Sequence, residues 1–277
     1  MTASNITTSK LAEMKRQRTP IVALTAYDAP TAKLLNDAGV DMILVGDSVA
    51  NVKLGYENTI PLSLEEILHH VRAVKRGNSR AMLVADMPYL TYELDLAEAL
   101  RNAGRLIKEG GAQAVKIEGG RDVAPVIKEL LRVNIPVIGH LGLTPQALHK
   151  LGGYKVQGRL PEDAEKKITD AKILEGAGAC AVVLECVPAE LAKEITSKIS
   201  IPTIGIGAGP DCDGQILVSD DLWGMSGKPT PKFVKRYADL HTQMAEAVRA
   251  YADEVRESVF PGPDHIYTAV KRSRSPR

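Results

Sequence analysis

The sequence predicts an α/β protein, namely a (β/α)8 TIM barrel that forms a single domain and has a helical leader at its N-terminus. Three observations lead to this prediction: a length of 277 residues, eight short apolar runs, and amphipathic helical stretches between them. Chains of this length often form one barrel, and nearly continuous apolar runs indicate parallel strands buried on both faces. We expect the barrel domain and its leader to span 1–265, and a basic, disordered tail to span 266–277.

The expected elements alternate along the chain after a leader helix over 10–17. The expected strands are short and rich in β-branched residues, and they span 21–26, 42–46, 81–86, 114–118, 135–140, 180–186, 201–206 and 215–219. The expected helices span 29–38, 64–76, 95–109, 121–133, 161–177, 188–198 and 231–258. The eighth unit is the weakest, because its apolar run is brief and the helical stretch before it is short.

A doubly wound open sheet is the structural alternative, because it is built from the same alternation of strands and helices. Sheets of that kind often carry a G-x-G-x-x-G motif at the first turn from strand to helix, where a dinucleotide binds. No such motif follows the first expected strand in this chain. The sequence therefore favours the barrel.

Composition and charge argue against several functional classes. The formal net charge of +1 gives no electrostatic basis for binding nucleic acid or an anionic membrane. No apolar run reaches the roughly 18 residues of a membrane span, and the first twenty residues lack the apolar centre of a secretion signal. The three cysteines have no metal-ligand spacing, which is typical of thiols in a reducing cytoplasm. We expect a cytoplasmic protein without nucleic-acid or membrane partners, and we interpret the basic run 271–277 as disordered rather than as a nucleic-acid arm.

Charged side chains stand at the carboxyl ends of several expected strands. Asp47, Asp86 and Glu185 each follow or end an apolar run, and the run 114–118 contains Lys116 and Glu118 two residues apart. On a strand this spacing places both side chains on one face. Reactive groups of barrel enzymes lie at the carboxyl ends of the strands, so we expect these side chains to meet.

The expected cluster favours a hard divalent cation. Carboxylates held close together raise each other's pKa values or bind a cation, and a buried lysine and carboxylate are costly unless they pair or hold a ligand. The acidic groups supply only oxygen ligands, without a Cys–His pattern, so magnesium is favoured over zinc. His140 and Ser48 also stand at expected strand ends and complete the candidate site.

Each candidate also has a simpler structural interpretation. Asp47 and Asp86 are also compatible with helix N-caps or turn formers, and Glu185 with a cap on the helix that begins near Ala189. Lys116 and Glu118 can form a purely structural ion pair, and a buried histidine such as His140 is more often a satisfied core residue than a catalyst. Four acidic groups that arrive independently at strand ends are the feature that chance explains poorly.

Two glycine-rich stretches allow two interpretations each. The run 205–209 has the sequence GIGAG, which is similar to a phosphate-binding loop but also typical of a tight exit from a strand. The stretch 144–159 is rich in glycine and basic residues. It is compatible with a lid that excludes water from the site and equally with an ordinary long loop.

Six motifs stand out along the chain: LVGDS at 44–48, VKIEGG at 115–120, GHLGLTPQ at 139–146, GGYKVQGR at 152–159, LECVP at 184–188 and IGIGAG at 204–209. Together they resemble the ketopantoate hydroxymethyltransferase family, also called 3-methyl-2-oxobutanoate hydroxymethyltransferase. The resemblance extends from about residue 19 to about residue 265 and depends on the combination of motifs rather than on any one of them.

The resemblance implies a magnesium-dependent transfer of a hydroxymethyl group from 5,10-methylenetetrahydrofolate to 3-methyl-2-oxobutanoate. The product would be 2-dehydropantoate, a precursor of pantothenate and coenzyme A, made in the cytoplasm by a homodecamer built as a pentamer of dimers. The resemblance also implies roles for single residues. The implied metal ligands are Asp47, Asp86 and Glu118; the implied oxoacid contacts are Asp47, Ser48, Asp86 and Lys116; and the implied proton acceptor is Glu185. Apart from the resemblance, His140 at its strand end is a candidate supporting residue that would orient a water or a carboxylate.

Two rival interpretations remain open. The first is a magnesium-dependent oxoacid lyase or mutase of the phosphoenolpyruvate mutase and isocitrate lyase type, although the reactive cysteine loop typical of such enzymes is not found in this sequence. The second is an oxoacid-binding barrel without turnover, against which the presence of both Lys116 and Glu185 argues. A turnover assay with the oxoacid and the folate separates all three.

Overall fold

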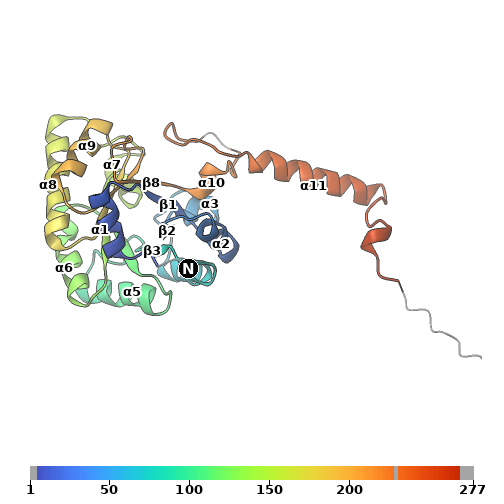
Figure 1. Ribbon diagram of the computed structural model, residues 1–277, viewed down its shortest axis with the longest axis horizontal. Helices are drawn as coiled ribbons and strands as arrows, with labels where there is room; N and C mark the ends of the chain where they lie inside the picture. The colour runs from blue at the N-terminus through green and yellow to red at the C-terminus, as the bar shows by residue number, and fades with distance from the viewer. Residues whose placement is uncertain (1–4, 228–229, 269–277) are drawn as a thin grey trace, which may run out of the picture.

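The strands of this protein close into a barrel, with every strand parallel to its neighbours and in sequence order. The computed structural model describes residues 5–227 and 230–268, and the barrel is on the left of Figure 1. The strands are β1 (Ile21–Thr25), β2 (Met42–Val45), β3 (Met82–Asp86), β4 (Ala114–Glu118), β5 (Val137–Gly142), β6 (Ala181–Glu185), β7 (Thr203–Ile206) and β8 (Gly214–Leu217). The predicted (β/α)8 barrel is confirmed, including its weakest unit.

Helices surround the barrel and connect its strands, except that β7 leads to β8 through a loop without a helix. The α-helices are α1 (Thr8–Gln17), α2 (Ala29–Asp37), α3 (Val49–Val52), α4 (Leu64–Gly77), α5 (Leu96–Lys108), α6 (Ala124–Arg132), α7 (Leu148–Leu151), α8 (Pro161–Ala177), α9 (Ala189–Lys198), α10 (Ser219–Leu222) and α11 (Leu240–Arg256). Short 3-10 turns lie at η1 (Arg121–Val123), η2 (Pro145–Ala147) and η3 (Pro263–His265). Among the described residues, no helix is long and apolar enough to cross a membrane.

Local sequence signals explain where several helices begin. Ser63 and Glu66 form a reciprocal capping box at the start of α4. The final helix was expected over 231–258, but α11 begins only at Leu240, after Asp239 accepts a hydrogen bond from the backbone of Thr242. Helix α11 extends away from the barrel (Figure 1) and has no buried residue.

The core has two parts that the strands separate. Alternate strand residues point outward and pack with the helices, as Ile43 and Leu83 do against Val71. The others fill the barrel interior together with apolar side chains of the leader, including Leu11 and Met14. Helix α1 therefore packs against the interior cluster, and the predicted leader is an integral part of the barrel core.

The strand register decides which polar side chains become neighbours at the mouth of the barrel. Asp86 of β3 is paired with Lys116 of β4, and Glu118 of β4 is paired with His140 of β5. Strand β6 then brings Glu185 beside the end of β5. Parallel pairing thus gathers groups that are distant in the sequence along one arc of the rim.

The predicted tail over 266–277 falls mostly outside the described residues, which end at 268. Its disorder therefore stays a prediction. The division of the chain into one barrel domain and a tail therefore also stays a proposal.

We predict that truncating a buried core side chain lowers the free energy of unfolding much more than truncating an exposed one. Leu68 of α4 is fully buried, whereas Leu34 of α2 is 57% exposed. Leu68→Ala should lower the free energy of unfolding by about 2–5 kcal/mol, because it leaves a cavity. Leu34→Ala is the matched control and should change it by less than about 0.5 kcal/mol. Urea titration monitored by circular dichroism measures both, and equal losses would contradict the packing described.

Candidate active site

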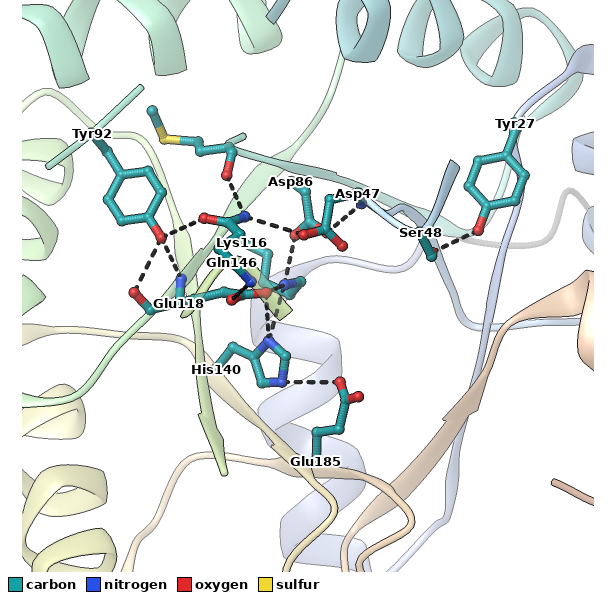
Figure 2. A network of polar contacts seen from close by, with 11 residues as sticks. Tyr27, Asp47, Ser48, Asp86, Tyr92, Lys116, Glu118, His140, Gln146 and Glu185 are labelled. Atoms are coloured by element: carbon teal, nitrogen blue, oxygen red, sulfur yellow. Dashed lines mark hydrogen bonds and ion pairs between the residues drawn. The ribbon is translucent and has the colours of Figure 1, made fainter. Parts of the chain in front are cut away.

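The predicted site residues lie together at the carboxyl ends of consecutive strands, as Figure 2 shows. Asp47 directly follows β2, Asp86 ends β3, and Lys116 and Glu118 both point inward from β4. All four side chains are buried. The prediction that these charged groups meet is thus confirmed in geometry.

Lys116 is the cation at the centre of this cluster. Its Nζ lies 2.8 Å from Asp86 Oδ1 and 3.6 Å from Glu118 Oε1, with only 5% of the side chain exposed. Burial lowers the pKa of Lys116, but the three neighbouring carboxylates outweigh burial and raise it, so the ammonium group stays charged. Burial alone would raise the pKa of Glu118. Attraction to Lys116 and the contact with His140 outweigh burial, so the pKa is lowered and the carboxylate is ionised.

Asp47 carries the negative charge that Lys116 does not neutralise. Its backbone N–H donates to Asp86 Oδ2 at 2.8 Å, which fixes the two aspartates side by side. Burial, followed by repulsion from Glu118 and Asp86, raises the pKa of Asp47 to about 8. Burial also raises the pKa of Asp86, against the opposing effect of Lys116. At neutral pH the cluster therefore favours either a proton on one aspartate or an additional cation.

These carboxylates fit a hard cation in their chemistry. Asp47, Asp86 and Glu118 supply oxygen donors only. The buried Asp86 Oδ1 contacts Lys116, and the buried Glu118 Oε1 contacts Lys116 and His140 Nδ1. Magnesium prefers such ligands. Within the described ranges, no three His, Cys, Asp or Glu side chains are already arranged around a common metal position. The donors are therefore suitable, and metal binding would require side-chain adjustment.

His140 lies between the cluster and Glu185. Its Nδ1 is 3.3 Å from Glu118 Oε1, and its Nε2 is 3.2 Å from Glu185 Oε2. Burial and Lys116 lower the pKa of His140, but contacts with the two glutamates outweigh them and raise it to about 9. Its Nδ1 also lies 3.1 Å from Lys116 Nζ. A protonated imidazole donates from both nitrogens, so in that form Nδ1 is directed to Glu118, whereas in the neutral form Nδ1 can accept from Lys116.

Ser48 lies at the edge of the cluster and is held by a tyrosine. The Ser48 Oγ and the Tyr27 hydroxyl are 2.8 Å apart. Burial raises the pKa of Tyr27, which stays neutral and able to donate. Ser48 therefore retains a hydroxyl that can donate to a ligand beside Asp47.

Gln146 and Tyr92 belong to the site although neither was among the predicted residues. The Gln146 amide donates to Asp47 Oδ2 at 3.3 Å and to the carbonyl of Met87 at 3.0 Å, and its backbone N–H donates to Glu118 Oε2 at 3.0 Å. The Tyr92 hydroxyl lies 3.0 Å from Gln146 Oε1 and accepts from the backbone of Glu118. Gln146 ends the GHLGLTPQ motif, which was a usable signal, whereas Tyr92 lies in a loop without any pattern.

The structure excludes capping as the role of the predicted acids. Ser48, not Asp47, is the N-cap residue of α3, and Pro188, not Glu185, precedes α9; neither helix has a side-chain cap. Asp86 accepts from the backbone of Asp47, outside any helix start. Both aspartates thus face the cluster.

The glycine run 205–209 packs closely against other parts of the chain. A Cβ atom at Gly207 would meet the ring of Phe233, and one at Gly205 would meet the Cys212 side chain. At Gly209 the neighbour is Ala189. These glycines are needed for close packing within the chain, which supports the strand-exit interpretation, and the phosphate interpretation stays a prediction.

Two cavities flank the cluster. One of about 660 Å³ lies over the barrel mouth and is lined by Asp47, Ser48, Asp86, Lys116 and Glu185, among others. Residues 154–156 from the predicted lid stretch also line it. The other, of about 760 Å³, lies beside the loops that follow β4 and β5, and His140 lines both.

A barrel with reactive groups around a cavity at its strand ends is the architecture of a TIM-barrel enzyme. Solved structures share the fold, among them a phosphonopyruvate hydrolase in complex with oxalate and Mg++ (15% identity, TM-score 0.62, 95% of this chain and 92% of that one). A 2,3-dimethylmalate lyase of the phosphoenolpyruvate mutase/isocitrate lyase superfamily also has a similar structure (16% identity, TM-score 0.57, covering 94% of this chain and 91% of that one). At these identities the likeness shows the fold alone.

Sequence comparison gives the family. The ketopantoate hydroxymethyltransferase family model matches residues 5–263. A 3-methyl-2-oxobutanoate hydroxymethyltransferase of Thermoanaerobacter sp. (strain X514) is 54% identical over 267 residues, covering 96% of this chain and 97% of the relative. One from Geotalea daltonii is 57% identical over 249 residues, covering 90% and 93%. The chain therefore belongs to the ketopantoate hydroxymethyltransferase family and is a transferase, as the sequence motifs predicted.

We predict that His140 stabilises the fold in a pH-dependent way. Its pKa is higher in the folded chain, about 9, than the ordinary value of 6.5, so its contribution is complete below about pH 6.5 and is lost as the pH rises through about 9. The difference in unfolding free energy between the wild type and His140→Gln should shrink over this interval by roughly 2–3 kcal/mol. Denaturant titrations at several pH values measure it, and a difference that does not vary with pH would contradict a charged His140.

Proposed function

We propose that this transferase moves a hydroxymethyl group from 5,10-methylenetetrahydrofolate to 3-methyl-2-oxobutanoate, giving 2-dehydropantoate for pantothenate and coenzyme A synthesis. Overall, the oxoacid, the folate and one water give 2-dehydropantoate and tetrahydrofolate. The observation that supports this most is that a charged cluster centred on Lys116 faces Glu185 across one cavity. Such a cavity accommodates an oxoacid anion on one side and a base on the other.

The charged side of the cavity is suited to hold the oxoacid. In this proposal Lys116 balances the substrate carboxylate, Ser48 donates a hydrogen bond to it, and Asp47 and Asp86 are near neighbours. Asp47, Asp86 and Glu118 would hold Mg²⁺, which would supply Lewis-acid polarisation of the ketone worth several kcal/mol.

Glu185 is suited to remove the proton from C3 of the oxoacid. It comes from β6, across the cavity from Asp47 and Asp86, and its carboxylate is held 3.2 Å from His140. The C–H bond breaks toward Glu185, and its electron pair becomes the enolate of the oxoacid. Water cleaves the methylene carbon from the two folate nitrogens as formaldehyde, which leaves tetrahydrofolate. The enolate carbon then attacks the formaldehyde carbon, its C=O pair becomes an alkoxide, and the proton held by Glu185 passes to that alkoxide to give the hydroxymethyl group. His140 is a positioning residue in this scheme, because it links the base to the cluster through Glu118.

The loop after β5 is suited to shield this reaction from water. Tyr154 and Val156 line the cavity, although both side chains are largely exposed. Excluding water strengthens electrostatic interactions within a site. The lid interpretation of 144–159 is therefore retained as part of the proposal.

We also infer that the chain acts in the cytoplasm as a homodecamer built from dimers. The projecting helix α11 supports self-association. Its exposed apolar side chains include Met244, Val248, Tyr251 and Val255, which follow one face at helical spacing.

We predict that Glu185→Gln removes proton transfer while leaving the oxoacid site intact. Deuterium exchange at C3 of 3-methyl-2-oxobutanoate in D₂O, followed by NMR, should slow by about 10²-fold or more, because loss of a general base typically costs 10²–10⁴. Mg²⁺ binding should stay near the wild-type value. Glu190→Gln, an exposed glutamate on the following helix, is the matched control. Rapid exchange in Glu185→Gln would exclude Glu185 as the base.

We predict that Asp47→Asn stabilises the metal-free protein and removes its response to magnesium. Asn mimics the protonated carboxyl group that the raised pKa of about 8 favours, so the melting temperature at pH 8 without metal should rise, by about 2–4 °C for each kcal/mol gained.

Adding Mg²⁺ should raise the melting temperature of the wild type but not that of Asp47→Asn, because the variant lacks one of the proposed ligands. Asp37→Asn, at an exposed ion pair on α2, is the control and should keep the wild-type response. A full magnesium response in Asp47→Asn would remove Asp47 from the ligand set.

A further inference from the structure

The cavity over the barrel mouth has two chemically different walls. The wall formed by β2, β3, β4 and β5 carries the charged cluster. The opposite wall is apolar and is formed by Val183 of β6, Ile206 of β7, Ile216 and Leu217 of β8, and Phe233. Glu185 stands at the boundary between the two walls.

This cavity is larger than the oxoacid requires. Its volume of about 660 Å³ lies within the range of roughly 300–1,000 Å³ that is typical of sites for drug-sized ligands. A five-carbon acid bound at Lys116 and Ser48 leaves the apolar half open. A second, larger and flatter ligand therefore has room beside Glu185.

Phe233 offers a flat surface in the apolar half. Its ring packs directly on the carboxyl end of β7, because a Cβ atom at Gly207 would lie 2.9 Å from its Cδ1 and Cγ. The ring is partly buried, and it also lines the cavity. A planar heterocycle can stack on an aromatic face held in this way.

Asp221 offers a polar group on the same side. It lies in α10, just after β8, it lines the cavity, and it is half-buried. Burial raises its pKa, and the nearby Arg236 opposes that effect. Apart from Glu185 and the charged cluster, Glu57 is the other carboxylate among the described lining residues, and it is exposed on the loop between α3 and α4.

We propose that the apolar half of this cavity holds the reduced pterin of the one-carbon donor, stacked on Phe233 and hydrogen-bonded to Asp221. The pyrimidine edge of a pterin presents two parallel N–H donors, N3–H and the 2-amino group, and a carboxylate accepts both at once. This inference rests on the proposed function, which requires a folate donor.

The placement is consistent with the geometry of the reaction. A pterin between Phe233 and Asp221 lies on the side of Glu185 opposite the charged cluster, so that the donor and the oxoacid meet beside the base. The neighbouring cavity of about 760 Å³ is less suitable. Among the described lining residues it shares only His140 with the first cavity, so a donor there would be separated from the oxoacid by the cluster itself.

The test compares Asp221→Asn with Glu57→Gln as the matched control. We expect the Kd for tetrahydrofolate, measured by calorimetry on the full chain, and the KM for 5,10-methylenetetrahydrofolate to rise about tenfold to a hundredfold in Asp221→Asn, because a bond to a charged acceptor is lost. Both constants should keep their wild-type values in Glu57→Gln. A rise confined to Glu57→Gln would place the pterin on the opposite side and overturn the proposal.

Phe233→Leu tests the stacking surface separately, because leucine preserves apolar packing on Gly207 while removing the ring. It should weaken tetrahydrofolate binding several-fold and leave the KM for the oxoacid unchanged. Exchange at C3 of the oxoacid without folate is measured in both variants as a readout of the charged half. Loss of that exchange together with folate binding would show a structural defect and overturn the proposal.

The outcomes separate this inference from the proposed function. Wild-type turnover with an unchanged Kd for tetrahydrofolate in both Asp221→Asn and Phe233→Leu would overturn the pterin site alone. A wild-type enzyme without folate-dependent turnover and without tetrahydrofolate binding would overturn the proposed function, and the pterin site with it.

Discussion

The ion pair between Lys116 and Asp86, deep in the barrel mouth, is the interaction on which the site depends. Taking a charge out of water costs several kcal/mol unless close partners compensate, and here Asp86 at 2.8 Å and Glu118 at 3.6 Å do so. The compensation of charge is incomplete, because Asp47 adds a further carboxylate, and its pKa is raised to about 8. The excess of negative charge makes the cluster receptive to a cation, and the barrel supplies the stability that maintains this arrangement.

The closed sheet and the loops after it hold these charges in place. Pairing of β3 with β4 sets Asp86 beside Lys116, and pairing of β4 with β5 sets Glu118 beside His140. Gln146, from the loop after β5, then links two members of the charged cluster, because it donates hydrogen bonds to both Asp47 and Glu118. Side chains fixed by register and by neighbouring hydrogen bonds lose little entropy when a ligand binds, which is how preorganised sites favour a developing charge.

Much of the fold and the charged half of the site was predictable from local patterns. An apolar run that ends in an acid identifies a strand and its functional end, as at Asp47, Asp86 and Glu118, and the barrel topology brings such ends together. The contacts of Tyr92 and Phe233 were not predictable, because both residues come from irregular segments whose path depends on tertiary packing. The close packing of 205–209 was not predictable for the same reason: the space over Gly207 is taken by Phe233, from a segment beyond β8.

The charged wall and the apolar wall of the cavity match what the proposed chemistry requires of its two ligands. An oxoacid that must lose a C–H proton needs nearby positive charge for its oxygens, whereas a folate ring is held best by flat apolar surface and a single acceptor. In the proposed reaction one base serves both ligands and would stand where the two walls meet; Glu185, at the end of β6, lines the cavity there. His140 contacts both Glu118 and Glu185, so in the same proposal it would couple the position of the base to the charged wall.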